Sequence, residues 1–232
     1  MRINKYLAEA GICSRREADK LITENKVILN GIKARLGDQV QKGDIVQVAG
    51  KKITQRAKKV YILYNKPVGV ITTTREGVNS VLDKVHVPER VYPVGRLDVA
   101  TSGLLLLTND GRVVNRMLKG KYGHEKEYRV TVDKKVTKMF LEKICKGIVL
   151  EKRKTLPAYA KAVGDRVFTL TLTEGRNRQI RRMCEALGYK VIKLVRVRLL
   201  HLRITGLQPG SWRHLTDQEL HMLFKTLRFP RE

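Results

Sequence analysis

The sequence predicts an α+β protein made of a small and a large domain. Hydrophobic residues make up 42% of the 232 residues, which is enough to build a packed core. After residue 60, segments with a strand pattern outnumber helical ones and do not alternate strictly with them, as an α+β domain requires. The polar and basic stretch 55–59 is typical of a linker. We therefore expect domains at residues 1–58 and 59–232.

The first 58 residues predict two helices followed by short strands. Apolar side chains at helical spacing predict a helix over residues 3–10. Ser14 followed by Glu17 has the pattern of a capping box, which predicts that a second helix begins there. Asn-Gly at 30–31 predicts a tight hairpin turn. Residues 45–48 alternate as a strand does.

This first domain is strongly basic. Residues 1–60 contain 14 Lys and Arg against 6 Asp and Glu, a net charge of 14 − 6 = +8. Arg15 and Arg16 lie in the first turn of the second predicted helix, where the helix dipole favours anions. A phosphate bound between the two guanidinium groups would resolve this conflict. The alternative is a solvated pair of cations that is offset by Glu17 and Asp19.

Longer strands are predicted from Val60 onward. Apolar or alternating segments indicate strands, and a spacing of three and four residues indicates helices. The predicted strands and extended segments cover residues 60–64, 91–97, 104–107, 126–132, 167–173 and 191–204. The predicted helices cover residues 113–118, 136–145, 178–187 and 216–227, the last opened by a second capping box.

The overall charge points to a polyanionic partner. The chain has 48 Lys and Arg against 22 Asp and Glu, a net charge of +26, and so much charge of one sign opposes compaction. A cationic surface without a specific partner is the alternative. The first 14 residues lack the apolar run of a secretory signal, and no stretch has the ~18 apolar residues of a membrane span. Three separated cysteines, Cys13, Cys145 and Cys184, argue against a disulfide framework or a Cys-based zinc site. We expect a cytoplasmic protein that binds nucleic acid rather than a membrane.

The first candidate site is the loop segment 95–103, GRLDVATSG, in which Asp98 lies beside Arg96. A carboxylate in such a loop can be a nucleophile, a general base, a metal ligand or a turn former. A metal site needs further acids or His, and on the C-terminal side Asp110 is the next acid. We therefore expect no metal, and from the residues alone a turn is the default interpretation.

The second candidate site is the segment 174–183, EGRNRQIRRM, which has four Arg within seven residues at the start of a predicted helix. Cations again crowd a helix N-terminus, and a bound anion is the simplest explanation. Asn177 and Gln179 can read base edges. The alternatives are a solvated basic face, or an Arg that pairs with Asp98 and keeps it ionised.

The third candidate is Tyr128, in a strand whose residues alternate between apolar and polar. It lies on the apolar face, where most Tyr residues belong to the core. A Tyr that lines a pocket can also stack on a base or transfer a proton.

Together these segments resemble the RsuA/RluF family of bacterial rRNA pseudouridine synthases. The residues GRLD and TSGL within 95–104 are similar to the catalytic Asp motif, KEY at 126–128 to the Tyr motif, and 174–183 to the third motif. Residues 1–58 resemble the RNA-binding domain first seen in ribosomal protein S-four. The segments HEKEY, MCE and GSWR, at 124–128, 183–185 and 210–213, are most similar to the RluF branch. That branch modifies a uridine in large-subunit (23S) rRNA.

The resemblance implies a fold, an activity and a set of catalytic residues. The fold is an S-four-like domain followed by a catalytic domain with a mixed, largely antiparallel sheet flanked by helices. The activity is the isomerisation of uridine to pseudouridine within RNA by base flipping, with no cofactor and no metal. Asp98 is implied as the nucleophile, Tyr128 as the pocket Tyr, and Arg181 as the partner that keeps Asp98 ionised. Leu194 is implied as an apolar residue of the pocket.

The remaining expected contacts with RNA come from both domains. Arg96 is expected to fill the gap that the flipped uridine leaves. The other expected contacts are Leu97, then Lys5, Arg15, Arg16, Lys33 and Arg35 in the small domain, and Arg176, Asn177, Arg178, Gln179 and Arg182 in the third motif. Alternatives are the same chemistry on a tRNA anticodon stem-loop or on small-subunit rRNA, and a non-catalytic rRNA-binding or ribosome-assembly factor. We expect a monomer that does not bind DNA, because no helix-turn-helix or zinc-finger signature is present.

Overall fold

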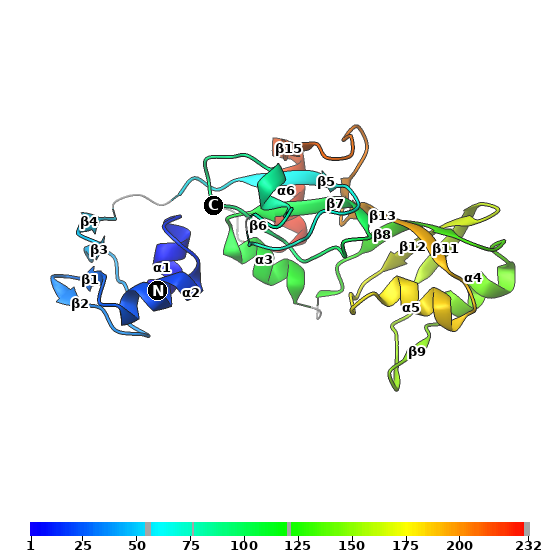
Figure 1. The fold of residues 1–232 in the computed structure, drawn as a ribbon, viewed down its shortest axis with the longest axis horizontal. Coiled ribbons are helices and arrows are strands. Elements are labelled where there is room, and N and C mark those ends of the chain that lie inside the picture. The colour runs from blue at the N-terminus through cyan, green and yellow to red at the C-terminus, as the bar shows by residue number, and fades with distance from the viewer. Residues whose placement is uncertain (54–56, 76, 120–121, 230–232) are drawn as a thin grey trace. The chain divides into compact units, whose positions relative to one another are not determined.

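The computed structural model of the chain describes residues 1–53, 57–75, 77–119 and 122–229 (Figure 1). The chain divides into two compact units. The first consists of Met1–Val60 with Val87–Val91 and Asn109–Gly111, and the second of Tyr61–His86, Tyr92–Thr108 and Arg112–Glu232. Residues 55 and 56 of the predicted linker lie outside the described residues.

The first unit contains two helices and a small antiparallel sheet. Its helices are α1 (Ile3–Glu9) and α2 (Arg15–Thr23). Its strands are β1 (Val27–Leu29), β2 (Ile32–Lys33), β3 (Val46–Val48) and β4 (Lys51–Lys52), in the sheet order β2-β1-β3-β4 among the described residues. The capping box is confirmed, because Ser14 Oγ accepts from the Glu17 N–H and a Glu17 carboxylate oxygen accepts from the Ser14 N–H. Both residues of the predicted Asn30-Gly31 turn have positive φ.

The second unit is built on one mixed sheet. Within the described residues its nine strands follow the path β11-β12-β8-β13-β7-β5-β15, with β14 added to β13 and β6 to β7. The strands are β5 (Tyr61–Lys66), β6 (Tyr92–Pro93), β7 (Ser102–Thr108), β8 (Lys126–Val132), β11 (Tyr159–Gly164), β12 (Val167–Leu172), β13 (Val191–Leu199), β14 (Leu202–Arg203) and β15 (Trp212–His214). The pair β7 and β13 is parallel, and the other pairs described in this sheet are antiparallel. The predicted α+β fold with a largely antiparallel sheet is confirmed.

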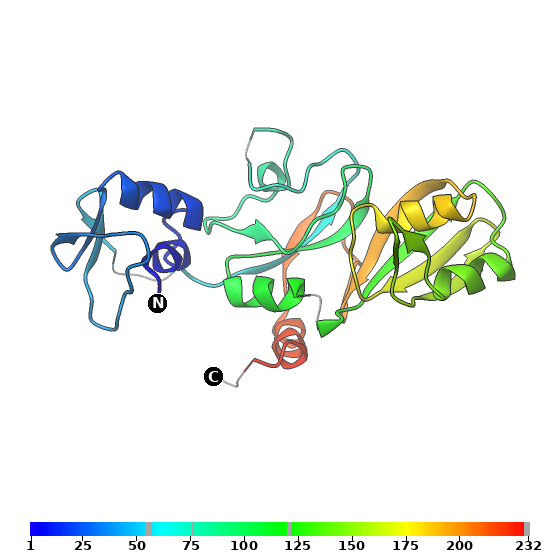
Figure 2. The same ribbon diagram turned by 90° about the horizontal axis from the view of Figure 1, so that it is seen from below.

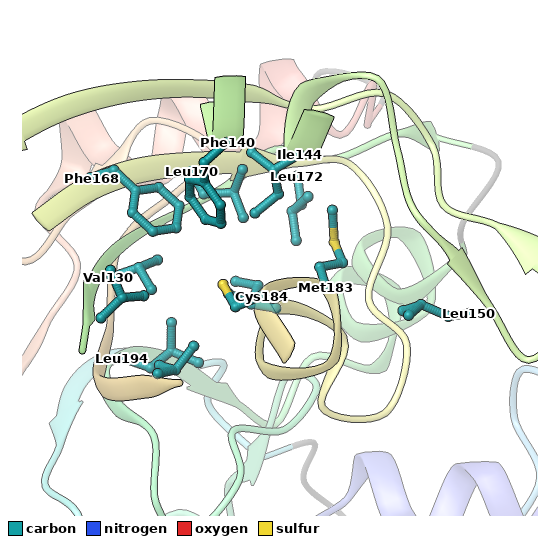
Figure 3. Close-up of a cluster of buried hydrophobic side chains, with 13 residues drawn as sticks. Val130, Phe140, Ile144, Leu150, Phe168, Leu170, Leu172, Met183, Cys184 and Leu194 are labelled. Atoms are coloured by element: carbon teal, nitrogen blue, oxygen red, sulfur yellow. The ribbon is translucent and has the colours of Figure 1, made fainter. Parts of the chain in front are cut away.

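Helices cover both faces of this sheet (Figure 2). They are α3 (Gly111–Leu118), α4 (Lys138–Cys145), α5 (Gln179–Ala186) and α6 (Asp217–Thr226), with a short 3-10 helix at Leu82–Lys84. On one face, α4 and α5 pack against β8, β12 and β13, in a core that contains Phe140, Phe168 and Met183 (Figure 3). A second core joins α3 and α6 to β5 and β7 through Leu63, Leu106 and other side chains.

The register of the strands shows that the two cores lie on opposite faces. Lys66 pairs with Gly103, so Leu63 and Leu106, which point the other way, face α3 and α6. Gly103 lies opposite Arg196 in β13, and Arg196 lies opposite Tyr128 in β8, so the three residues share a face. Tyr128 packs against the core of α4 and α5. The face that carries Lys66 is therefore the face that α4 and α5 cover further along the sheet.

Most of the predicted elements are present, and the differences have clear causes. The segment 91–97 pairs as a strand only at Tyr92–Pro93, because the chain turns at Gly95 with φ 78°. The edge strand β11 was not predicted, since its side chains are mostly exposed and lack an apolar face. The hairpin of β9 (Val149–Leu150) and β10 (Arg153–Lys154) and the last strand, β15, were also not predicted.

None of the helices in the described parts of the chain is long and apolar enough to cross a membrane.

Candidate active site

A row of four opposite residues crosses the sheet where β7 begins. Lys66 in β5 lies opposite Gly103 in β7, and Gly103 lies opposite Arg196 in β13. Arg196 in turn lies opposite Tyr128 in β8. Opposite residues of neighbouring strands share a face of the sheet. Lys66, Arg196 and Tyr128 therefore line the same face, with a position between the two cations that carries no side chain.

The glycine in this row is required by the close approach of β7 and β13. A Cβ at Gly103 would overlap the Arg196 carbonyl oxygen and its amide nitrogen, and the φ of Gly103 is +111°, which side chains rarely tolerate. The buried Arg196 guanidinium donates from Nε to the carbonyl of Leu104 at 2.7 Å. Gly103 thus allows Arg196 to lie directly against the strand that follows the Asp98 loop.

Asp98 lies in this loop, and the loop backbone is fixed. The Asp98 carbonyl accepts the Thr101 N–H at 2.9 Å, which closes a tight turn. The neighbouring Leu97 is buried, and its N–H and carbonyl both bond the Thr72 hydroxyl, at 3.3 and 2.9 Å. Since the backbone closes the turn, the half-buried carboxylate of Asp98 is not needed for it.

Lys66 holds the loop from the β5 side. Its side chain is fully buried, and its Nζ donates to the carbonyls of Pro67 and Val70, both at 2.8 Å, with the Val99 carbonyl at 3.5 Å. Burial lowers the pKa of Lys66 to about 8, and the negative charge of Asp98 opposes this shift. The cation therefore anchors the residue after Asp98 and also interacts with the carboxylate through space.

Arg181 holds the same loop from α5. Its Nη2 donates to the Ala100 carbonyl at 2.8 Å, and its Nη1 donates to the Val191 carbonyl at 3.1 Å. Burial and the neighbouring Arg178 lower the pKa of Arg181, while the charge of Asp98 opposes the shift. Arg181 therefore contacts the loop through its backbone and reaches the Asp98 charge electrostatically.

Several buried polar atoms around this loop have no hydrogen-bond partner among the described residues. They include the Thr101 hydroxyl, Arg181 Nε, Arg196 Nη2 and the hydroxyl of Tyr64, which lies two residues before Lys66 on the same face. Buried polar groups in proteins normally have a partner, so this concentration indicates a place for water or ligand groups.

Tyr128 and Leu194 form the apolar side of the row. Leu194 is buried in the core of α4 and α5, two residues from Arg196 on the same face of β13. Tyr128 is half-buried and packs against that core. Lys126, at the start of β8, has its pKa lowered by burial and by the nearby Arg196 charge, while Glu174 opposes this. The site therefore combines an apolar wall with several cations around one carboxylate.

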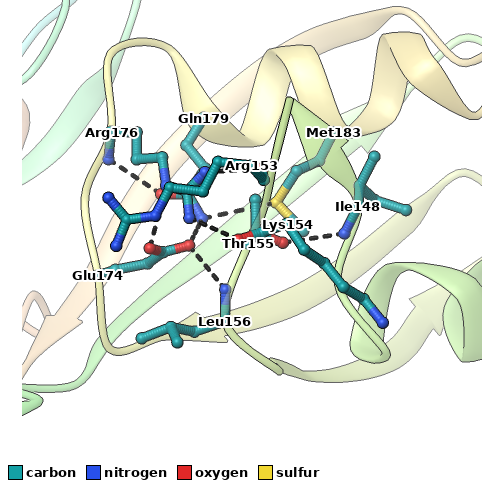
Figure 4. A network of polar contacts seen from close by, with 9 residues as sticks. All are labelled: Ile148, Arg153, Lys154, Thr155, Leu156, Glu174, Arg176, Gln179 and Met183. Carbon is teal, nitrogen blue, oxygen red and sulfur yellow. Dashed lines mark hydrogen bonds and ion pairs between the residues drawn. The ribbon is translucent and has the colours of Figure 1, made fainter. Parts of the chain in front are cut away.

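Within the third motif, Arg176 is occupied by contacts inside the protein (Figure 4). Its Nε bonds Glu174 at 3.2 Å, and its two terminal nitrogens donate to the carbonyls of Arg153 and Lys154, at 3.0 and 2.7 Å. The buried Gln179 bonds the other oxygen of Glu174 and the Arg176 N–H. Arg176 and Gln179 thus attach the β9–β10 hairpin to the start of α5, and their contact with RNA stays a prediction.

The other residues of this motif are more accessible. Asn177 and Arg178 are exposed, and Arg178 begins α5 in a left-handed conformation with φ 48°. Arg182 is half-buried and pairs with Glu151 at 2.9 Å. Arg96, in the Asp98 loop, is exposed.

In the first unit, the two acids that were candidates to offset Arg15 and Arg16 are engaged elsewhere. Glu17 pairs with Arg90 at 2.9 Å, and Asp19 accepts from the Asn4 amide at 2.8 Å. The Ser14 N–H and Arg90 lower the pKa of Glu17 to about 2.

All five predicted contacts in this unit have exposed side chains. Lys5 lies 3.5 Å from Glu9, and the Arg15 guanidinium donates to Asn4 at 3.4 Å. Arg16, Lys33 and Arg35 are the other three.

Lys66 and Arg196 were not predicted from the sequence. A signal existed for each, because Lys66 ends an apolar strand directly before Pro67, and Arg196 shares the face of Leu194 by the two-residue period of a strand. Among the described residues, no three His, Cys, Asp or Glu side chains gather in a way that could hold a metal ion.

Comparison with known proteins gives a consistent match. The family described as "RNA pseudouridylate synthase" matches residues 60–186, and the S4 domain matches residues 1–46. The chain is 46% identical over 230 residues to the "Dual-specificity RNA pseudouridine synthase RluF" of Escherichia coli strain K12, covering 98% of this chain and 79% of that protein.

Two further matches cover nearly the whole length of both chains. The "Ribosomal large subunit pseudouridine synthase B" of Bacillus subtilis strain 168 is 44% identical, over 96% of this chain and 95% of that protein. A crystal structure titled as a pseudouridylate synthase matches with a TM-score of 0.72 and 31% identity, over 96% of this chain and 99% of that one.

Proposed function

Because the chain belongs to the RNA pseudouridylate synthase family, we propose that it isomerises one uridine of large-subunit rRNA with Asp98 as the catalytic carboxylate. One observation carries the assignment of Asp98. It is the half-buried carboxylate whose charge acts on the buried Lys66 and the half-buried Arg181, and both cations also bond the backbone of its own loop.

The chemistry requires a bond exchange at the ribose. The bond from ribose carbon 1′ to nitrogen 1 of the uracil breaks, the base turns, and carbon 5 bonds to the same ribose carbon. Carbon 5 then loses its proton and nitrogen 1 gains one, so substrate and product are isomers and no electrons are exchanged with another molecule.

Asp98 serves this exchange as an anion. Burial alone disfavours a charged carboxylate, whereas cations within several ångströms favour it. Lys66 and Arg181 supply that charge from two elements, and their bonds to the Val99 and Ala100 carbonyls hold the carboxylate in place. A nucleophile that is fixed and ionised before the substrate arrives needs little reorganisation at the moment of reaction.

The target uridine leaves its helix to reach Asp98, which costs a few kcal/mol. The exposed Arg96 fills the space left in the helix, since a guanidinium plane stacks on bases. Tyr128 lies on the same face as the buried cations, where its ring stacks on the uracil and its hydroxyl takes part in proton transfer at the sugar. Leu194 forms the apolar floor beneath it.

Large-subunit rRNA is the substrate that the relatives favour. The name of the Bacillus subtilis relative describes that protein as a ribosomal large subunit pseudouridine synthase. The term dual specificity in the name of the Escherichia coli relative favours a second RNA, and we propose a tRNA anticodon stem-loop for this role.

The test is tritium release from RNA labelled at carbon 5 of uridine. Wild type and Asp98→Asn are compared on large-subunit rRNA that lacks the modification, with Asp165→Asn, an exposed turn residue, as the matched control. We expect release by wild type and Asp165→Asn, no release by Asp98→Asn, and similar RNA affinity for all three. Release by Asp98→Asn, or loss of its RNA binding or folding, would overturn the assignment of Asp98.

A further inference from the structure

A pocket of about 460 Å³ shares no lining residue with the row of Lys66, Gly103, Arg196 and Tyr128 or with Asp98. Its wall includes Leu200 and Leu227, which belong to the core of α3 and α6 on the opposite face of the sheet. Pockets that hold small ligands or single nucleotides have volumes of about 300–1,000 Å³. The pocket is therefore large enough for one nucleotide and lies outside the proposed catalytic site.

Cations from three elements line this pocket. Arg198, at the end of β13, pairs with Glu125 at 3.0 Å and Glu127 at 2.7 Å. Arg116, at the end of α3, and Arg228, after α6, form no ion pair with a described residue. Two guanidinium groups therefore remain for an outside anion, and phosphate suits the geometry of guanidinium.

An aromatic stack forms one side of the pocket. The Arg116 guanidinium lies 5.6 Å from the centre of the Tyr122 ring, and the Tyr122 and His124 rings are stacked with centres 5.8 Å apart. Tyr122 is 37% exposed. Aromatic rings of this kind bind the faces of unpaired bases.

Two imidazoles complete the lining. His201 Nε2 lies 2.9 Å from the Glu219 carbonyl, and His124 Nε2 lies 3.1 Å from the Arg116 carbonyl. A ring nitrogen that faces a carbonyl carries a proton, so in a neutral ring the other nitrogen is an acceptor. Burial lowers the pKa of His124, which favours the neutral ring, and His201 Nδ1 has no partner among the described residues. Such an acceptor suits a ribose hydroxyl, which distinguishes RNA from DNA.

We infer that this pocket binds an unpaired nucleotide of the substrate RNA other than the reacting uridine. Arg116 and Arg228 bind its phosphate, an imidazole accepts from its 2′-hydroxyl, and Tyr122 stacks on its base. The inference rests on the proposed function, because it requires an RNA substrate. A free nucleotide offers the same chemistry, and the experiment separates the two sources.

The test uses the full chain with Arg228→Gln and Tyr122→Leu, and Arg203→Gln as the control. Arg203 is an exposed arginine on β14 that does not line the pocket. The substitution Arg203→Gln therefore removes the same charge at a position outside the pocket. Affinity for the rRNA substrate is measured across salt concentrations, with turnover at saturating RNA and thermal unfolding alongside. We expect each pocket variant to bind about 5- to 10-fold more weakly, with turnover at saturation unchanged. Arg228→Gln also lowers the salt slope by about one unit, as the loss of one phosphate contact does.

Two results would overturn the inference. The first is that both pocket variants bind the rRNA with the same affinity and the same salt slope as Arg203→Gln. The other is binding of uridine monophosphate in wild type that the pocket variants lose while their rRNA affinity stays unchanged, which would mark a site for free nucleotides. A failure of the proposed function is recognised separately, because it abolishes tritium release by wild type while leaving these binding comparisons intact.

Discussion

Gly103 in β7 lies opposite Arg196 in β13, with no room between their backbones for a Cβ atom. This close approach places the buried Arg196 guanidinium against the Leu104 carbonyl, at the point where the Asp98 loop becomes a strand. The same glycine separates Arg196 from Lys66 on the other side. Two buried cations and the loop of the proposed nucleophile therefore depend on one position without a side chain.

Gly103→Ala is expected to destabilise the protein and abolish turnover. The added methyl group overlaps the Arg196 backbone, which cannot move without disturbing its pairing with β8, and the positive φ adds strain. We expect a loss of more than about 3 kcal/mol in the free energy of unfolding, measured by urea titration. The control is Gly206→Ala, which has φ +76° but open space around its Cβ, and should lose about 1 kcal/mol. Equal losses in the two variants would contradict the steric argument.

Lys66→Met is expected to remove a pH dependence of stability. Burial lowers the pKa of Lys66 from 10.5 to about 8 in the folded protein. Below about pH 8 both states carry the proton, and the buried charge opposes folding. Between about pH 8 and 10.5, Lys66 is protonated in the unfolded chain but largely deprotonated in the folded one. Its contribution therefore makes the stability of wild type rise with pH.

Urea titrations at pH 7.5, 9 and 10 measure this effect. The stability of wild type relative to Lys66→Met should increase with pH across this range. Lys193→Met, which removes an exposed lysine of β13, is the control and should follow wild type. Parallel curves for wild type and Lys66→Met would contradict the prediction.

Arg181→Lys is expected to lower turnover by roughly 100-fold with little change in folding. The guanidinium bonds the Ala100 and Val191 carbonyls at once, and a single ammonium group cannot reach both. The Asp98 loop then loses one of its anchors. Single-turnover tritium release and thermal unfolding are the measurements. The neighbouring Arg182→Lys, whose partner is Glu151, is the control, and an equal loss of turnover there would refute a specific role for Arg181.

Arg16→Gln is expected to flatten the salt dependence of RNA binding by about one unit, with turnover at saturating RNA unchanged. Glu17 and Asp19 are bonded to Arg90 and Asn4 and, among the described residues, not to Arg16, so we expect a phosphate to pair with Arg16. Filter binding across salt concentrations gives the slope. Lys20→Gln, on the same helix but paired with Glu24, serves as the control. If both variants give the same slope as wild type, Arg16 contacts no phosphate.

Local signals in the sequence predicted the helices well. The capping boxes at Ser14 and Thr216 form as expected, because each depends on residues three positions apart. The strand β8 has the predicted bounds, since its alternation follows one buried face. The edge strand β11 and the short strand β15 have no such signal, because their side chains are mainly exposed or half-buried.

The candidate site was predictable only in part. Asp98, Tyr128 and Arg181 were found through motifs, whereas Lys66 and Arg196 belong to a row that joins β5, β7, β13 and β8. Register between strands so far apart in sequence follows from tertiary packing and cannot be read from local periodicity. The engagement of Arg176 with the carbonyls of Arg153 and Lys154 depends on the unpredicted hairpin β9–β10.

The pairing of β15 with β5 sets an order of folding during synthesis. Trp212 pairs with Tyr64, so the first strand of the large unit gains its outer neighbour only when nearly the whole unit has been made. The sheet of the first unit, in contrast, joins strands that all lie within the first 52 residues. Contacts between distant residues form later than local ones. We therefore expect the small sheet of the first unit to form while the large sheet is still incomplete, and a chain that ends before residue 212 lacks the outer strand β15.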